Sequence, residues 1–66
     1  DDVDLEAAVV DAMNELDDGD GAEQDAVVSA VVNEHGVDPD AVESAIQEAL
    51  MGGKCYEPAD GRLKAI

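Results

Sequence analysis

Three stretches of apolar residues at helical spacing, each followed by glycine, constrain the fold of this chain more than any other feature. Within each stretch the apolar side chains recur at steps of three and one, so they share one face of a helix and lack the alternation of a half-buried strand. A chain of 66 residues has room for one small domain, and we expect the three faces to pack on a common core. The apolar positions are Leu5, Ala8, Val9, Ala12, Met13 and Leu16; Val27, Val28, Val31 and Val32; and Val42, Ala45, Ile46, Ala49 and Leu50.

The first helix is predicted near residues 2–17. Acidic residues at positions 1, 2, 4 and 6 suit the positive end of a helix dipole, and the run of Asp and Gly at 17–21 favours a turn. That run does not match a calcium-binding loop, because the fifth and sixth positions counted from Asp18 are Ala22 and Glu23.

The second and third helices are predicted from their capping residues. Gly36 fits the left-handed position that closes a helix over residues 24–35. Asp38 as N-cap and Pro39 at the first helical position begin the third helix, and the glycine pair at 52–53 ends it.

After the glycine pair the sequence is typical of a β-hairpin. Residues 54–57 and 62–66 are predicted strands, and residues 58–61 are the predicted turn. A lone hairpin is marginal in water, so we expect it to lie on the helices with Leu63 and Cys55 facing inward. A short strand near residues 22–23 would extend the sheet. The pattern predicts an α+β, mostly α, fold: a winged helix-turn-helix, three helices followed by a β-hairpin wing, as a single domain over residues 1–66.

The charge of the chain is strongly acidic. Eighteen Asp and Glu against three Lys and Arg give a net charge of −15, which repels nucleic acid and anionic membranes. The acids are interspersed with apolar residues, which favours a halophilic type of surface over a dedicated acidic tail.

The cellular setting is predicted from cysteine usage and hydropathy. Cys55 stands alone, and a small secreted domain would normally carry several disulfides. No apolar run approaches the roughly 20 residues of a membrane-spanning helix. We therefore expect a cytoplasmic protein, and the first residue, Asp1, suggests a C-terminal fragment of a longer chain.

All cations lie in the last thirteen residues of the chain. They give this segment a net charge of +1, whereas residues 1–53 carry sixteen acids and no cation. An aromatic ring among cations can stack on a base while the cations contact phosphates. The hairpin is thus the candidate nucleic-acid contact; the alternative is that the cations pair with nearby acids and the ring packs partly in the core. The candidate residues are Lys54, Tyr56, Arg62 and Lys64.

The third helix has the wrong chemistry for DNA. A helix that reads the major groove uses cationic or amide side chains, and carboxylates beside phosphates are unfavourable. This helix favours either a solvated acidic face or a protein-contact face. The candidate protein-contact residues are Asp40, Glu43, Ser44 and Gln47.

The sequence predicts no catalytic residues, no cofactor and no metal site. His35 and Cys55 are isolated ligand types without a second Cys or His nearby in the sequence, so both are interpreted as structural. No phosphate-binding G-x-x-x-x-G-K-[ST] run is present.

Residues 53–66 resemble the ending of archaeal minichromosome maintenance (MCM) helicases, in which an apolar-Tyr-Glu-Pro strand precedes a Gly-containing turn and a short basic-apolar strand. Here the matching residues are Tyr56-Glu57-Pro58, Gly61 and Leu63, and Cys55 replaces the usual Val or Ile. The junction at residues 36–38 is also similar to that family.

The resemblance implies a non-catalytic regulatory domain that follows the ATPase module of a nucleoid-associated replicative DNA helicase. Its expected partners are other domains or subunits of the parent helicase and replication proteins, with weak DNA contact by the hairpin. Two alternatives remain: a DNA-binding winged-helix transcription regulator, and a protein-interaction winged helix of another replication or transcription complex.

Overall fold

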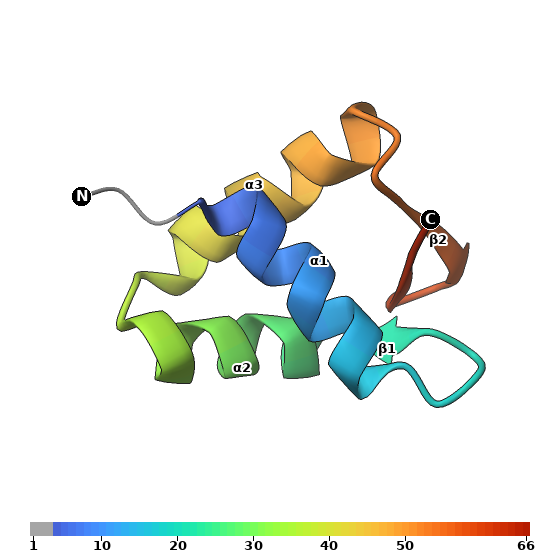
Figure 1. The fold of residues 1–66 in the computed structure, drawn as a ribbon, viewed down its shortest axis with the longest axis horizontal. Helices are drawn as coiled ribbons and strands as arrows, with labels where there is room; N and C mark the ends of the chain where they lie inside the picture. Colours follow the sequence, from blue (N-terminus) through green and yellow to red (C-terminus); the bar gives the residue numbers. More distant parts are fainter. Residues whose placement is uncertain (1–3) are drawn as a thin grey trace.

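The computed structural model describes residues 4–66 and shows a mostly helical α+β fold. In Figure 1 the three helices pack against one another and the small sheet lies at one end of them. The predicted fold class is confirmed at this level. The elements are α1 (Leu5–Leu16), β1 (Ala22–Glu23), α2 (Gln24–His35), α3 (Pro39–Met51), β2 (Cys55–Ala59) and β3 (Arg62–Ala65).

Helix α1 is shorter than predicted at both ends. Asp4 is its N-cap, and the Asp4 carboxylate accepts a hydrogen bond from the Ala7 N–H at 3.2 Å. Asp17 has an extended backbone and lies just beyond the helix. Both carboxylates therefore act at the helix ends and not within the helix. The acidic residues at positions 1 and 2, which were predicted to lie at the start of this helix, are outside the described residues.

The junction between α2 and α3 follows the prediction. Gly36 adopts a φ of +66° and its N–H donates to the Val32 carbonyl at 2.8 Å, which closes α2. Asp38 occupies the N-cap position and Pro39 begins α3. The Asp38 carboxylate makes no capping hydrogen bond; its carbonyl accepts from the N–H groups of Ala41 and Val42.

The sheet is antiparallel, with the strand order β1-β3-β2. The short strand predicted near residues 22–23 is confirmed, and Ala22 pairs with Leu63. The predicted turn at 58–61 is too long: Pro58 and Ala59 belong to β2, beside a break in register that follows Tyr56. Proline is tolerated there because β2 is an edge strand.

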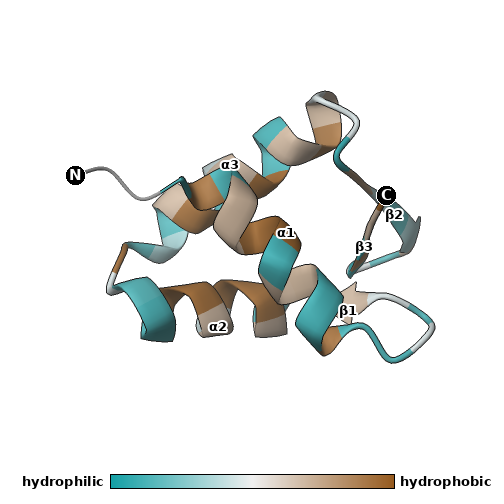
Figure 2. Cartoon of the chain, viewed as in Figure 1, coloured by the Kyte–Doolittle hydropathy of each residue, from teal (hydrophilic) through white to brown (hydrophobic). Residues whose placement is uncertain are grey.

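The core is entirely aliphatic apart from one thiol. Figure 2 shows hydrophobic colour along the side of α2 that faces α1. Leu63 and Cys55 are both buried, which confirms them as the inward anchors of the hairpin. Leu16 is 40% exposed, so its predicted place on the buried face is wrong; it is the last residue of α1. The buried residues are Val9, Ala12, Met13, Ala22, Val27, Val31, Val42, Ala45, Ile46, Ala49, Cys55 and Leu63.

Candidate functional site

Two lysines attach the hairpin to opposite ends of α1. Lys54 pairs with Glu6 in the first turn of the helix. The ammonium of Lys64 lies 2.9 Å from the Asp17 carboxylate, just beyond the last turn. The fold thus brings acids at the two ends of α1 next to the lysines of residues 54–66.

Arg62 is held by the turn that follows α1. Its Nη1 donates to the Gly21 carbonyl at 3.1 Å and lies 3.8 Å from Asp18 Oδ1. Lys64 makes a second, longer contact to this turn, at 3.4 Å from the Gly19 carbonyl. The cations therefore pair with nearby acids, as the first part of the alternative states. Its second part is not found, because Tyr56 is exposed and lies outside the core cluster.

Asp17 organises this turn. One of its carboxylate oxygens accepts from the N–H groups of Gly19 at 2.8 Å and Gly21 at 3.0 Å, and the other contacts Lys64. The Gly19 hydrogen bond, followed by those of Lys64 and Gly21, lowers the pKa of Asp17 from 3.8 to about 2. The bond to Asp17 also raises the pKa of Lys64.

Sequence reasoning missed the roles of Asp17 and Glu6. A usable signal exists for Asp17, because glycines two and four residues later allow its side chain to bond their N–H groups. Glu6 has no such local signal, since its partner Lys54 lies 48 residues away.

Three of the four candidate nucleic-acid residues meet at one open hollow of about 460 Å³. Tyr56 and Lys64 are partners across β2 and β3, and Arg62 lies at the far end of β3. Tyr56 is 44% exposed, and an exposed aromatic residue can stack on a base. The hollow is lined by Gly19, Asp20, Tyr56, Pro58, Ala59, Arg62 and Lys64, and we call it the Tyr56 hollow.

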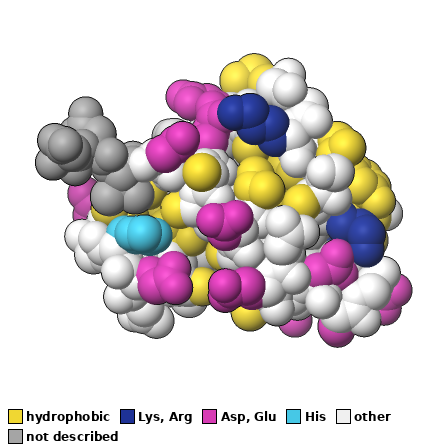
Figure 3. Space-filling view, viewed as in Figure 1, with side chains coloured by type: hydrophobic (Ala, Val, Ile, Leu, Met, Phe, Trp, Pro, Cys, Tyr) yellow, Lys and Arg dark blue, Asp and Glu magenta, His cyan; other side chains and the backbone are white. Residues whose placement is uncertain are grey.

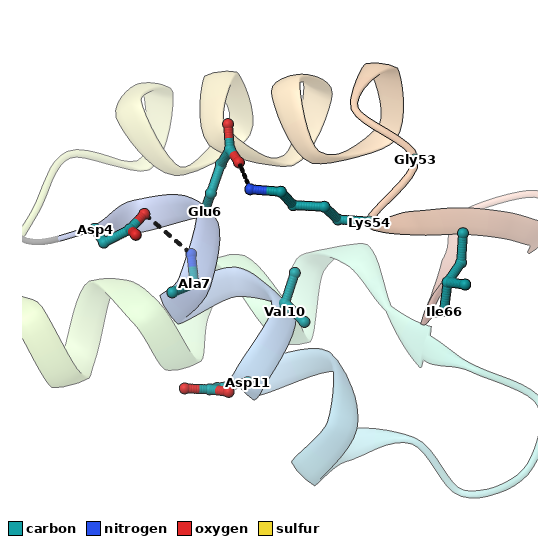
Figure 4. A pocket seen from close by; sticks show the side chains of 8 residues that line it. All are labelled: Asp4, Glu6, Ala7, Val10, Asp11, Gly53, Lys54 and Ile66. Carbon is teal, nitrogen blue, oxygen red and sulfur yellow. Dashed lines mark hydrogen bonds and ion pairs between the residues drawn. The ribbon is translucent and has the colours of Figure 1, made fainter.

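Lys54 lies apart from this hollow. It lines a separate groove of about 410 Å³ between α1 and the end of the chain, with Val10 and Ile66 among its walls. Figure 4 shows the Lys54 side chain reaching toward Glu6. In Figure 3 two groups of cationic side chains stand apart, with an apolar area between them and acids dispersed over the rest of this face.

The four candidate protein-contact residues lie on α3. Asp40, Glu43, Ser44 and Gln47 are all exposed and line one open hollow. Glu48 and Met51 complete it, and Met51 is 80% exposed. The face is acidic along its length and ends in an apolar side chain. We call it the α3 face.

His35 and Cys55 lie on different elements. His35 Nε2 lies 3.7 Å from Glu34, its neighbour at the end of α2. Cys55 is buried in β2, and burial raises the pKa of its thiol. Residues 4–66 contain no group of three or more His, Cys, Asp or Glu placed to hold a metal ion.

Comparisons with protein families, with curated proteins and with solved structures found no match to this chain. Within the described part of the chain, every helix is too short or too polar to cross a membrane.

Proposed function

We propose that this chain is a non-catalytic winged-helix domain of an MCM-type replicative DNA helicase, acting through protein contacts and weakly through DNA contact by the hairpin. The element order and the pairing of short β1 with β3 support the winged-helix assignment. The Tyr56-Glu57-Pro58 segment that carries the resemblance forms most of β2.

The α3 face carries this proposal. In a helix-turn-helix protein the second helix of the motif enters the major groove, and in the proposed winged helix that second helix is α3. Its exposed carboxylates, Asp40, Glu43 and Glu48, oppose the approach of phosphates. The same carboxylates complement a protein surface rich in Lys and Arg, and Met51 adds an apolar contact at the end of the face.

The parent protein provides the test. We expect its sequence to encode a P-loop ATPase module, and we expect ATP hydrolysis to persist, at a changed rate, after deletion of residues 1–66. Asp40→Lys with Glu43→Lys on the α3 face should reproduce the effect of the deletion. A matched control, Asp25→Lys with Glu34→Lys, makes the same charge change on α2, where both residues are exposed.

Three results would contradict the proposal. A parent chain without an ATPase module removes the helicase assignment. Saturable binding of a duplex by the 66-residue chain, with NMR shifts concentrated on α3, would support the transcription regulator instead. Equal effects of the α2 and α3 charge reversals would show that the α3 face is not the contact.

A further inference from the structure

The Tyr56 hollow has the parts of a single-strand binding surface. Proteins that bind single strands without sequence preference combine aromatic rings, on which bases stack, with cations that follow the phosphates. Here the half-exposed Tyr56 ring lies beside Lys64, its cross-strand partner, and Arg62 lines the same hollow.

Carboxylates of the turn after α1 already pair with the cations of this hollow. Asp17 contacts Lys64 at 2.9 Å and Asp18 lies 3.8 Å from Arg62. Asp20 also lines the hollow and favours the charged form of Lys64. Three carboxylates therefore face two cations, so an approaching phosphate meets a net negative charge.

We propose that this turn masks the hairpin: its carboxylates take the place of phosphates, and single-stranded DNA binds the Tyr56 hollow only when they are displaced or neutralised. The inference rests on the proposed DNA contact of the hairpin and adds its regulation. The residues that form the mask are Asp17, Asp18 and Asp20.

The carboxylates of the mask hold their cations with different strength. The Asp18 side chain is 72% exposed and its contact with Arg62 is long, and ion pairs exposed to water in this way are weak. Asp17 is only 18% exposed and is also fixed by the N–H groups of Gly19 and Gly21. Arg62 therefore loses its carboxylate partner first, while its hydrogen bond to the Gly21 carbonyl can remain, and Lys64 stays masked until the Asp17 charge is removed.

The test removes the negative charges and keeps the turn. Asp17→Asn, Asp18→Asn and Asp20→Asn together leave a side-chain oxygen that accepts from Gly19 and Gly21. The matched control, Asp40→Asn, Glu43→Gln and Glu48→Gln, removes three charges from α3. Both variants change the net charge from −15 to −12.

The probe is a fluorescent oligothymidylate of about 12 nucleotides, within the usual site size of single-strand binders. At low salt we expect the triple variant Asp17→Asn, Asp18→Asn and Asp20→Asn to bind about tenfold more tightly than the wild type. Its salt dependence should be steeper by about 1.4 in log K against log salt, because two phosphate contacts become available. Tyr56→Ala in the same variant should lower the affinity again.

The outcomes separate the mask from the contact. Equal binding by wild type and variant, or an equal gain in the α3 control, overturns the mask and leaves the hairpin contact standing. Absence of binding by every protein overturns both. The double variant Asp18→Asn with Asp20→Asn keeps Asp17, and an intermediate affinity supports the stepwise release of Arg62 and Lys64. An NMR spectrum of each variant verifies its fold.

Discussion

The helical part of the chain, residues 4–53, and the hairpin part, residues 54–66, differ in charge as sharply as they differ in structure. The helical part contains no cation, and the hairpin part contains all three cations of the chain. In the fold this separation disappears, because each cation lies beside an acid of α1 or of the turn that follows it. Opposite charges that are far apart in the sequence thus join the two parts.

Burial joins the two parts more strongly than charge does. Leu63 and Ile46 are each 1% exposed, one in the hairpin part and one in the helical part. We expect Leu63→Ala or Ile46→Ala to lower the free energy of unfolding by about 2–5 kcal/mol. That is a large share of the roughly 3–10 kcal/mol that the usual per-residue value gives a domain of this length.

Two spectroscopic probes report the two parts separately during urea unfolding. Far-ultraviolet circular dichroism follows the helices, and fluorescence follows Tyr56, the single aromatic residue, which lies in the hairpin. We expect coincident transitions in the wild type and in Leu63→Ala. If the tyrosine signal of Leu63→Ala is lost first while the helices are unaffected, the hairpin is an independent appendage. Met51→Ala, at an exposed site, serves as the control.

Gly21 tests a close backbone approach between the two parts. It has a φ of +93°, and a Cβ at this position would lie 3.0 Å from the Leu63 carbonyl. Gly21→Ala should lower the free energy of unfolding by about 1–3 kcal/mol through backbone strain. The contact with the Leu63 carbonyl should add to this loss. Gly19→Ala is the matched control, because Gly19 also has positive φ but nothing lies within 4 Å of its Cβ position. Equal losses in urea unfolding would show that the contact with Leu63 has no energetic role.

The smallest expected effect concerns pH. The pKa of Asp17 is about 2 in the fold against 3.8 ordinarily, so its charge stabilises the fold above pH 4. This contribution is lost as the pH falls from about 4 to about 2. We expect the wild type to lose more stability over that interval than Asp17→Asn, measured by thermal unfolding at each pH. Parallel curves would contradict the role of the Asp17 charge.

Local patterns predicted most of the fold. Helical spacing, Gly36 and Pro39 located α2 and the start of α3, because these signals act within a few residues. The errors occur where distant contacts decide. Pro58 reads as a turn residue from its neighbours, but its place in β2 depends on that strand being at the edge of the sheet.

The candidate surfaces show the same limit. The α3 face follows from helical spacing alone, and the structure assembles it. The sequence grouped Lys54 with Tyr56 in one candidate nucleic-acid contact, yet the two line different hollows because Lys54 reaches to Glu6 on α1. The pairing of acids with cations depends on how the hairpin docks, which the local sequence does not contain.

The pairing of β1 with β3 has a consequence for the order of events during synthesis. Ala22 pairs with Leu63, so the two partners are separated by most of the chain. During synthesis the three helices precede β3, so β1 has no strand partner until residues 62–65 have left the ribosome. Until then Ala22 and the core positions beneath the hairpin stay open to water, and the domain completes its fold only once β3 has emerged.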